Sequence, residues 1–91
     1  MNNDNNIIDT EEGLIKYHET MIDKYKIQYI TYFMAPQFPN KNDILAVIKE
    51  YIDIMEEDLQ TIRNGERPPL SNQIKLINLT NRLDEISTRI N

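Results

Sequence analysis

The sequence contains no cysteine, only two glycines and a single histidine among 91 residues. Without cysteine the chain has no disulfide framework and no thiolate ligand for a metal. Two isolated glycines cannot form a glycine-rich loop for phosphates, and one histidine cannot complete a zinc motif that needs two. No nucleophile motif is present either. The sequence therefore predicts a protein that is not an enzyme and that binds no cofactor and no metal.

Basic residues are also scarce. Ten Lys and Arg face fifteen Asp and Glu, so the formal net charge is −5. The basic residues are scattered, and their densest group is Lys24 and Lys26. Because phosphate binding needs clustered positive charge, nucleic acid is not an expected partner.

A long apolar run is missing as well. The uncharged stretch "IQYITYFMAPQFP" at 27–39 is too short to span a bilayer and contains Pro36 and Pro39. The segment "MNNDNNIIDTEE" lacks the basic and apolar regions of a signal peptide. We therefore expect a cytoplasmic protein without a membrane span.

Helix start and stop signals predict one all-helical domain. We expect a flexible Asn-rich tail at 1–8 and a helical domain at 9–91. Its helices should cover about 10–34, 42–63 and 71–90.

The predicted helix ends rest on a few residues. Asp9 followed by Glu12 is typical of a capping box, and Pro36 should stop the first helix. Gly65 suits the left-handed position after the second helix, and Ser71 can cap the third. The candidate caps of the second helix are Asn40, Asn42 and Asp43.

A β-strand is the alternative for "IQYITYFM", because Ile, Tyr, Thr and Phe favour strands. The apolar spacing that starts at Leu14 continues into this stretch without a break in phase, and no second strand is available to pair with it. The helix is therefore the preferred prediction.

Apolar residues repeat at helical spacing in all three predicted helices. The first helix has a stripe formed by Leu14, Ile15, His18, Met21, Ile22, Tyr25, Tyr29, Tyr32 and Phe33. The second is apolar over half its circumference, at Ile44, Leu45, Val47, Ile48, Tyr51, Ile52, Ile54, Met55, Leu59 and Ile62. The third has a narrow seam of Leu76, Leu79, Leu83, Ile86 and Ile90. These faces predict an antiparallel three-helix bundle, which self-association can complete.

A second apolar patch lies on the side of the first helix opposite its stripe. It consists of Ile27, Ile30 and Met34, with Phe38 following in the turn at 36–39. The tail or this turn can cover the patch within the chain. Alternatively, these four residues bind another protein or a second copy.

Charged residues follow the second and third helices at regular spacing. Glu50 and Glu57 lie on one side of the second helix, and Lys75, Arg82 and Arg89 recur every seven residues on the third. We expect these residues to pair within the chain or between copies, which selects orientation more than it adds stability. An acidic surface for a basic partner is the alternative.

Two polar residues fall on apolar faces. Asp58 lies inside the apolar arc of the second helix, so it should sit at the edge of that arc or pair with an arginine. His18 is expected to be half-buried and bonded to a neighbour. The carboxylates that would make it a metal ligand or general base lie on other faces or more than a turn away, namely Glu11, Glu12 and Glu19.

The segments "NDILAVIKEYI" and "PPLSNQIKLI" resemble the long middle helix and the next, Pro-Leu-started helix of the immunity proteins that protect producers of pediocin-like bacteriocins. The resemblance covers about half of the chain. It implies an antiparallel four-helix bundle and an immunity function, whereas this sequence shows three helices.

Together these features predict a small acidic protein that acts by protein–protein interaction. It can be an inhibitor, an immunity or antitoxin-like factor, or an anti-defence or regulatory protein of a phage or plasmid. The high content of Ile and Asn is typical of AT-rich coding sequences. The alternative function is a structural homo-oligomer whose third-helix seams pair between chains.

Overall fold

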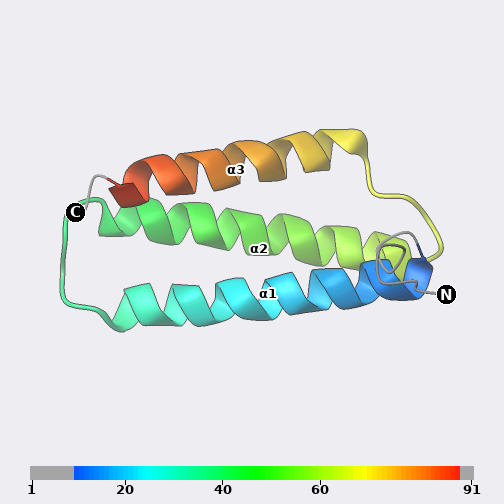
Figure 1. The fold of residues 1–91 in the computed structure, drawn as a ribbon, viewed down its shortest axis with the longest axis horizontal. Helices are drawn as coiled ribbons and strands as arrows, with labels where there is room; N and C mark the ends of the chain where they lie inside the picture. Colours follow the sequence, from blue (N-terminus) through cyan, green and yellow to red (C-terminus); the bar gives the residue numbers. More distant parts are fainter. Residues whose placement is uncertain (1–9, 89–91) are drawn as a thin grey trace, which may run out of the picture.

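The chain forms three α-helices, α1 (Glu11–Met34), α2 (Lys41–Arg63) and α3 (Leu70–Thr88), joined by short connections (Figure 1). The computed structural model describes residues 10–88, so the predicted tail and the predicted end of the third helix lie outside the described residues. Consecutive helices run antiparallel, which confirms the predicted all-α three-helix bundle.

The ends of α1 follow from local chemistry. Its N-cap is Thr10, whose Oγ1 accepts a hydrogen bond from the backbone N–H of Gly13 at 2.9 Å. The N-cap is therefore Thr10 and not Asp9, and because its third helical residue is Gly13, Thr10 forms no capping box. Ala35 is extended, with ψ of 155°, as the following Pro36 requires. The helix accordingly ends where the sequence predicts.

The end of α2 is a Schellman motif. Gly65 has the predicted left-handed conformation, with φ of 81°. Its N–H donates to the carbonyl of Ile62 at 2.9 Å, and the N–H of Glu66 donates to the carbonyl of Thr61 at 3.0 Å. At the other end of α2, Asn40 is the N-cap, but its side chain makes no capping hydrogen bond.

The start of α3 differs slightly from the prediction. The helix begins at Leu70, directly after Pro69, and the N–H of Asn72 donates to the carbonyl of Pro69 at 3.0 Å. Ser71 therefore lies in the first turn and is not the cap.

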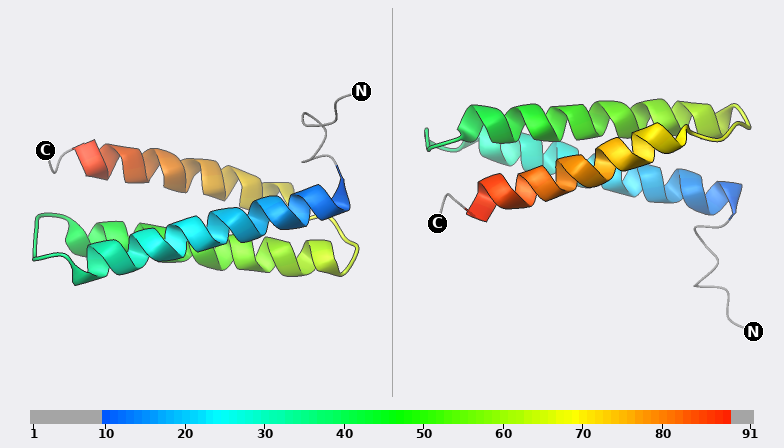
Figure 2. Two further views of the ribbon diagram at one scale, coloured as in Figure 1. Left: turned by 60° about the horizontal axis from the view of Figure 1, so that its bottom comes forward. Right: turned by 90° about the horizontal axis from the view of Figure 1, so that it is seen from above.

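The central element of the bundle is α2. Both outer helices pack on it (Figure 2). No Cα atom of α1 lies within 8 Å of a Cα atom of α3 in the described chain. The most deeply buried side chains, Ile44, Ile48 and Met55, all belong to α2. This position explains why α2 is apolar over half its circumference while the outer helices carry narrower stripes.

The seam of α3 packs on α2 of the same chain. Leu79 and Ile86 are buried in the core, and Leu76 and Leu83 pack against it. This part of the seam is therefore buried within the chain, and the alternative of a structural homo-oligomer stays a prediction. Ile90 lies outside the described residues.

None of the helices in the described range 10–88 is long and apolar enough to cross a membrane.

Candidate protein-docking surfaces

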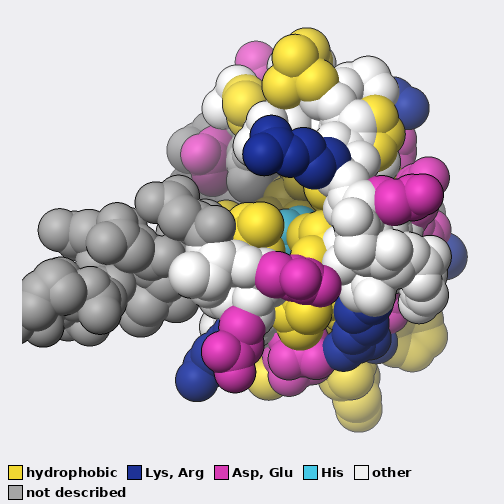
Figure 3. Space-filling view, turned by 90° about the vertical axis from the view of Figure 1, so that its right-hand side faces the viewer, with side chains coloured by type: hydrophobic (Ala, Val, Ile, Leu, Met, Phe, Trp, Pro, Cys, Tyr) yellow, Lys and Arg dark blue, Asp and Glu magenta, His cyan; other side chains and the backbone are white. Residues whose placement is uncertain are grey.

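An open groove lies between α1 and α3, with α2 as its floor. Its volume is about 830 Å³. Its walls include Leu14, Tyr17 and Met21 from α1 and Gln73, Ile77 and Thr80 from α3. Figure 3 looks at the end of the bundle where α1 begins and shows the histidine in a hollow between hydrophobic side chains. The groove is thus a mainly apolar surface with a few polar groups in it.

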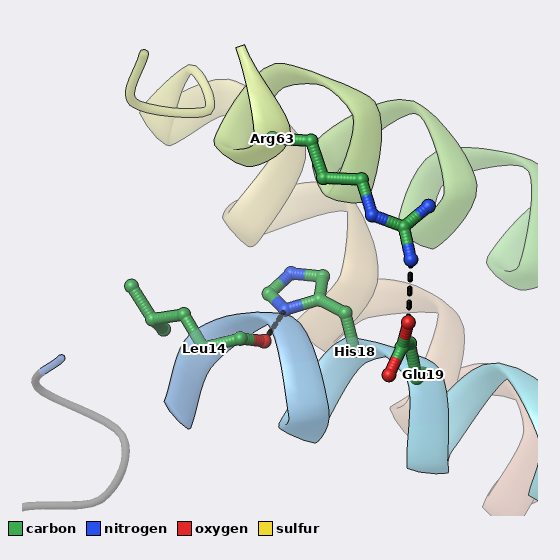
Figure 4. A network of polar contacts seen from close by, with 4 residues as sticks. All are labelled: Leu14, His18, Glu19 and Arg63. Carbon is green, nitrogen blue, oxygen red and sulfur yellow. Dashed lines mark hydrogen bonds and ion pairs between the residues drawn. The ribbon is translucent and has the colours of Figure 1, made fainter. Parts of the chain in front are cut away.

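His18 lies on the α1 side of this groove and is 8% exposed. Its Nδ1 lies 2.8 Å from the carbonyl oxygen of Leu14 (Figure 4). The predicted bond to a neighbour is confirmed, although the ring is buried and not half-buried.

The carboxylates near His18 do not join it. Glu19 pairs with Arg63 of α2 (Figure 4), so its carboxylate is directed away from the ring. Within residues 10–88, no group of three His, Asp or Glu side chains is arranged to hold a metal ion.

Asp58 also lines the groove, and its surroundings correct the prediction. The residue is 4% exposed, and its Oδ1 accepts a hydrogen bond from Nδ2 of Asn72 on α3 at 2.8 Å. Asp58 is therefore buried and paired with an asparagine, neither at the edge of the arc nor beside an arginine. Asn72 precedes Leu76 and Leu79 by four and seven residues, so helical spacing does place it on the seam.

Two tyrosines meet between α1 and α2 at the groove. The ring centroids of Tyr25 and Tyr51 lie 4.1 Å apart with a tilt of 45°. Burial raises the pKa of Tyr51 to about 12, and the neighbouring Tyr25 adds to this effect. Burial also raises the pKa of Tyr25, and the negative charge of Asp84 on α3 raises it further. Both hydroxyl groups therefore keep their protons well above neutral pH.

The patch predicted on α1 is exposed in the structure. Ile27, Ile30, Phe33 and Met34, here called the α1 outer face, are 57–77% exposed. Phe33 was expected on the buried stripe, and this expectation is wrong. Its ring stacks on Tyr29 along the surface of α1, with centroids 6.3 Å apart, and does not enter the core.

The connection between α1 and α2 does not cover this face. Phe38 packs against the core, and its ring centroid lies 5.9 Å from that of Tyr32. The structure therefore separates Phe38 from Ile27, Ile30 and Met34, with which it was grouped. Cover by the tail lies outside the described residues.

A third apolar surface was not identified from the sequence. Leu70, Ile74 and Ile77 of α3, here called the α3 outer face, are 53–70% exposed. They are separated by four and three residues, so they share one side of the helix. The same spacing argument that revealed the patch on α1 reveals this one.

Ion pairs involve other residues than those expected. The pairs among the described residues are Lys26–Glu56, Lys49–Asp53 and Glu19–Arg63. All of these side chains are about half exposed or more, so each pair contributes about 0–1 kcal/mol. No ion pair joins Glu50, Glu57, Lys75 and Arg82 to one another within residues 10–88, and Arg89 lies outside them. Their pairing with a second copy stays a prediction.

Comparisons with protein-family models, with curated proteins and with solved structures find no match to this chain. They therefore add no support to the resemblance to bacteriocin immunity proteins. Any assignment of function rests on the surfaces described above.

Proposed function

We propose that this protein acts by binding another protein through the α1 outer face and that it does not catalyse a reaction. The observation that carries the proposal is the exposure of four large apolar side chains on two turns of one helix. Four such residues present a few hundred Å² of apolar surface, and patches of this size on monomers are often functional.

The chemistry of this face indicates the kind of partner. The segment from Ile27 to Met34 carries no charge, while Asp23 and the ion-paired Lys26 lie just before it. An apolar surface with polar groups at one end suits an amphipathic helix, whose apolar side chains at helical spacing lie across it. The uncharged part supplies affinity, and the charged end orients the partner.

Such a contact fits several roles. The protein can act in the cytoplasm as an inhibitor, an antitoxin-like factor or a regulatory protein of a phage or plasmid. The immunity function implied by the resemblance to bacteriocin immunity proteins is an alternative. In each role, the α1 outer face is the surface that must stay free for the partner.

A matched pair of variants tests this proposal. Ile30→Asp changes the α1 outer face, and Ile74→Asp makes the same change on α3 at nearly equal exposure. Partners are captured from extracts of the source cells, purified, and titrated against each variant in solution. We expect Ile30→Asp to keep its helical circular dichroism but to lose binding, while Ile74→Asp keeps both.

Two results would contradict the proposal. If Ile30→Asp unfolds, the residue belongs to the core and not to a docking surface. If the folded Ile30→Asp variant binds the purified partner as the wild type does, the partner uses another surface.

A further inference from the structure

The groove has the shape left by a missing helix. In a four-helix bundle each helix packs on two neighbours around a common core. Here α1 and α3 each pack closely on α2, but within residues 10–88 no Cα atoms of α1 and α3 lie within 8 Å of each other, so one corner of such a bundle is open. The open corner extends from Leu14 to Tyr25 along α1, which is three turns or about 17 Å of helix.

The helix α3 is apolar on two opposite sides. Its core side carries Leu79 and Ile86, and the α3 outer face lies about half a turn away around the helix. A helix that packs against one neighbour needs only one apolar stripe. The exposed second stripe therefore indicates a second neighbour for α3.

We propose that two copies of this chain form a symmetric dimer in which the α3 of each copy fills the groove of the other. The two α3 helices then lie side by side at the centre of the dimer. Each α3 keeps α2 of its own chain on its core side. Its outer face packs on the α1 wall of the partner, where Leu14, Tyr17 and Met21 lie.

A single dimer contact accounts for both the open groove and the exposed α3 outer face. A helix from a different protein fills the groove but leaves Leu70 and Ile74 exposed. Insertion of α3 from a second copy covers both the groove and the α3 outer face. The proposal goes beyond the proposed function, because the α1 outer face points away from the groove and stays free in the dimer.

The dimer buries a large apolar area. Tyr17 is 42% exposed and the α3 outer face is 53–70% exposed. With about 150–250 Å² for a fully exposed tyrosine and a somewhat smaller area for Leu and Ile, these four residues offer roughly 400 Å² per copy. Two copies give about 800 Å², and the remaining groove walls and floor bring the total close to the ~1,000 Å² of a specific interface.

The symmetry follows from the arrangement of the helices. A two-fold axis perpendicular to the helix axes would make α2 of one copy occupy the position of α1 of the other. A two-fold axis parallel to the helix axes avoids this clash, and the two α3 helices then run parallel to each other. Thr80, which lines the groove, then faces Thr80 of the second copy. Its hydroxyl already donates to the carbonyl of Leu76 at 2.7 Å, so the contact leaves neither Thr80 hydroxyl unpaired.

The oligomeric state of matched variants tests the dimer. Ile77 on α3 and Ile30 on α1 are both 57% exposed, so Ile77→Asp and Ile30→Asp are the same change on two surfaces. Light scattering over a concentration series should show a dimer for the wild type and for Ile30→Asp. A charge without a partner in the interface should weaken the Ile77→Asp dimer by about 100-fold.

Cysteine cross-linking tests the geometry even if Ile77→Asp fails to fold. The chain has no cysteine, so Thr80→Cys introduces a single thiol. In the parallel dimer, oxidation should link two Thr80→Cys chains, because these facing positions should bring their Cα atoms within the ~4.4–6.8 Å that a disulfide spans. Asn78→Cys, which lies on another side of α3, should stay unlinked.

Several results would overturn the proposal. A wild type that stays monomeric at all concentrations excludes the dimer. If Ile30→Asp disrupts the dimer and Ile77→Asp does not, the two copies pair through the α1 outer face and the proposal is wrong. Efficient linkage through Asn78→Cys with none through Thr80→Cys excludes the parallel arrangement. None of these results depends on whether a partner binds the α1 outer face.

Discussion

The buried pair of Asp58 and Asn72 gives the sharpest prediction about stability. Asn72→Ala removes the amide that donates to Oδ1 of Asp58 at 2.8 Å, and Asp58 is only 4% exposed. A hydrogen bond to an ionised group contributes about 1.5–3 kcal/mol, and a buried acceptor that loses its donor retains its desolvation penalty. We therefore expect Asn72→Ala to lower the free energy of unfolding by about 2 kcal/mol.

This loss is large enough to measure by thermal and urea unfolding followed by circular dichroism. For a domain of 60–100 residues, each kcal/mol lowers Tm by about 4–8 °C, so the expected change is roughly 8–16 °C. Asn78→Ala is the matched control, because Asn78 is an exposed asparagine on the same helix, and it should change stability by less than ~0.5 kcal/mol.

A double-mutant cycle separates the pair from the two single changes. Asp58→Leu alone should destabilise the protein, because it leaves the Asn72 amide without its acceptor. Replacing both residues by leucine should restore most of the lost stability, since an apolar pair leaves no polar group unsatisfied. If Asn72→Ala costs less than ~0.5 kcal/mol, or if Asp58→Leu alone raises Tm, this account of the pair is wrong.

Two further predictions concern a turn and the buried tyrosines. Gly65→Ala should lower the free energy of unfolding, measured in urea, by about 1–2 kcal/mol, because φ of Gly65 is 81°. An added Cβ meets no atom within 4 Å, so the loss comes from the backbone conformation and not from a clash. A loss near zero would show that the left-handed conformation is not required. Absorbance titration should show Tyr51 ionising near pH 12, and Tyr51→Phe should remove this transition. The folded state holds the phenol proton of Tyr51 more tightly than the unfolded state does. The free energy of unfolding should therefore be constant below pH 10 and fall by ~1.4 kcal/mol per pH unit up to about pH 12. An unchanged free energy of unfolding over this range would contradict the burial of the phenol.

The sequence predicts the helices well because their signals are local. Pro36 and Gly65 restrict the backbone directly, and both ends lie where predicted. The helix starts are less certain, since several hydrogen-bonding residues compete for a cap. Thr10 took the role expected of Asp9, and Leu70 begins α3 one residue before Ser71.

Which apolar side chains stay exposed depends on which helices pack against each other. The spacing of apolar residues along the sequence does not specify those helix pairs. The predicted face at Ile27 and Ile30 is exposed, as its position opposite the stripe implies. Phe33 lies on the stripe by spacing but has no neighbouring helix to cover it. The partner of Asp58 was missed because Asn72 is polar and was left out of an apolar seam.

The absence of contact between α1 and α3 in the described chain also has a dynamic consequence. Each outer helix has its close backbone contacts with α2 and none with the other outer helix, so the opening of one leaves most contacts of the other intact. Amide hydrogens of α2 should exchange most slowly, while α1 and α3 exchange through separate opening reactions. A ligand or second chain that spans the groove would couple these two motions, and slower exchange in both outer helices would then report its binding without any change in the fold.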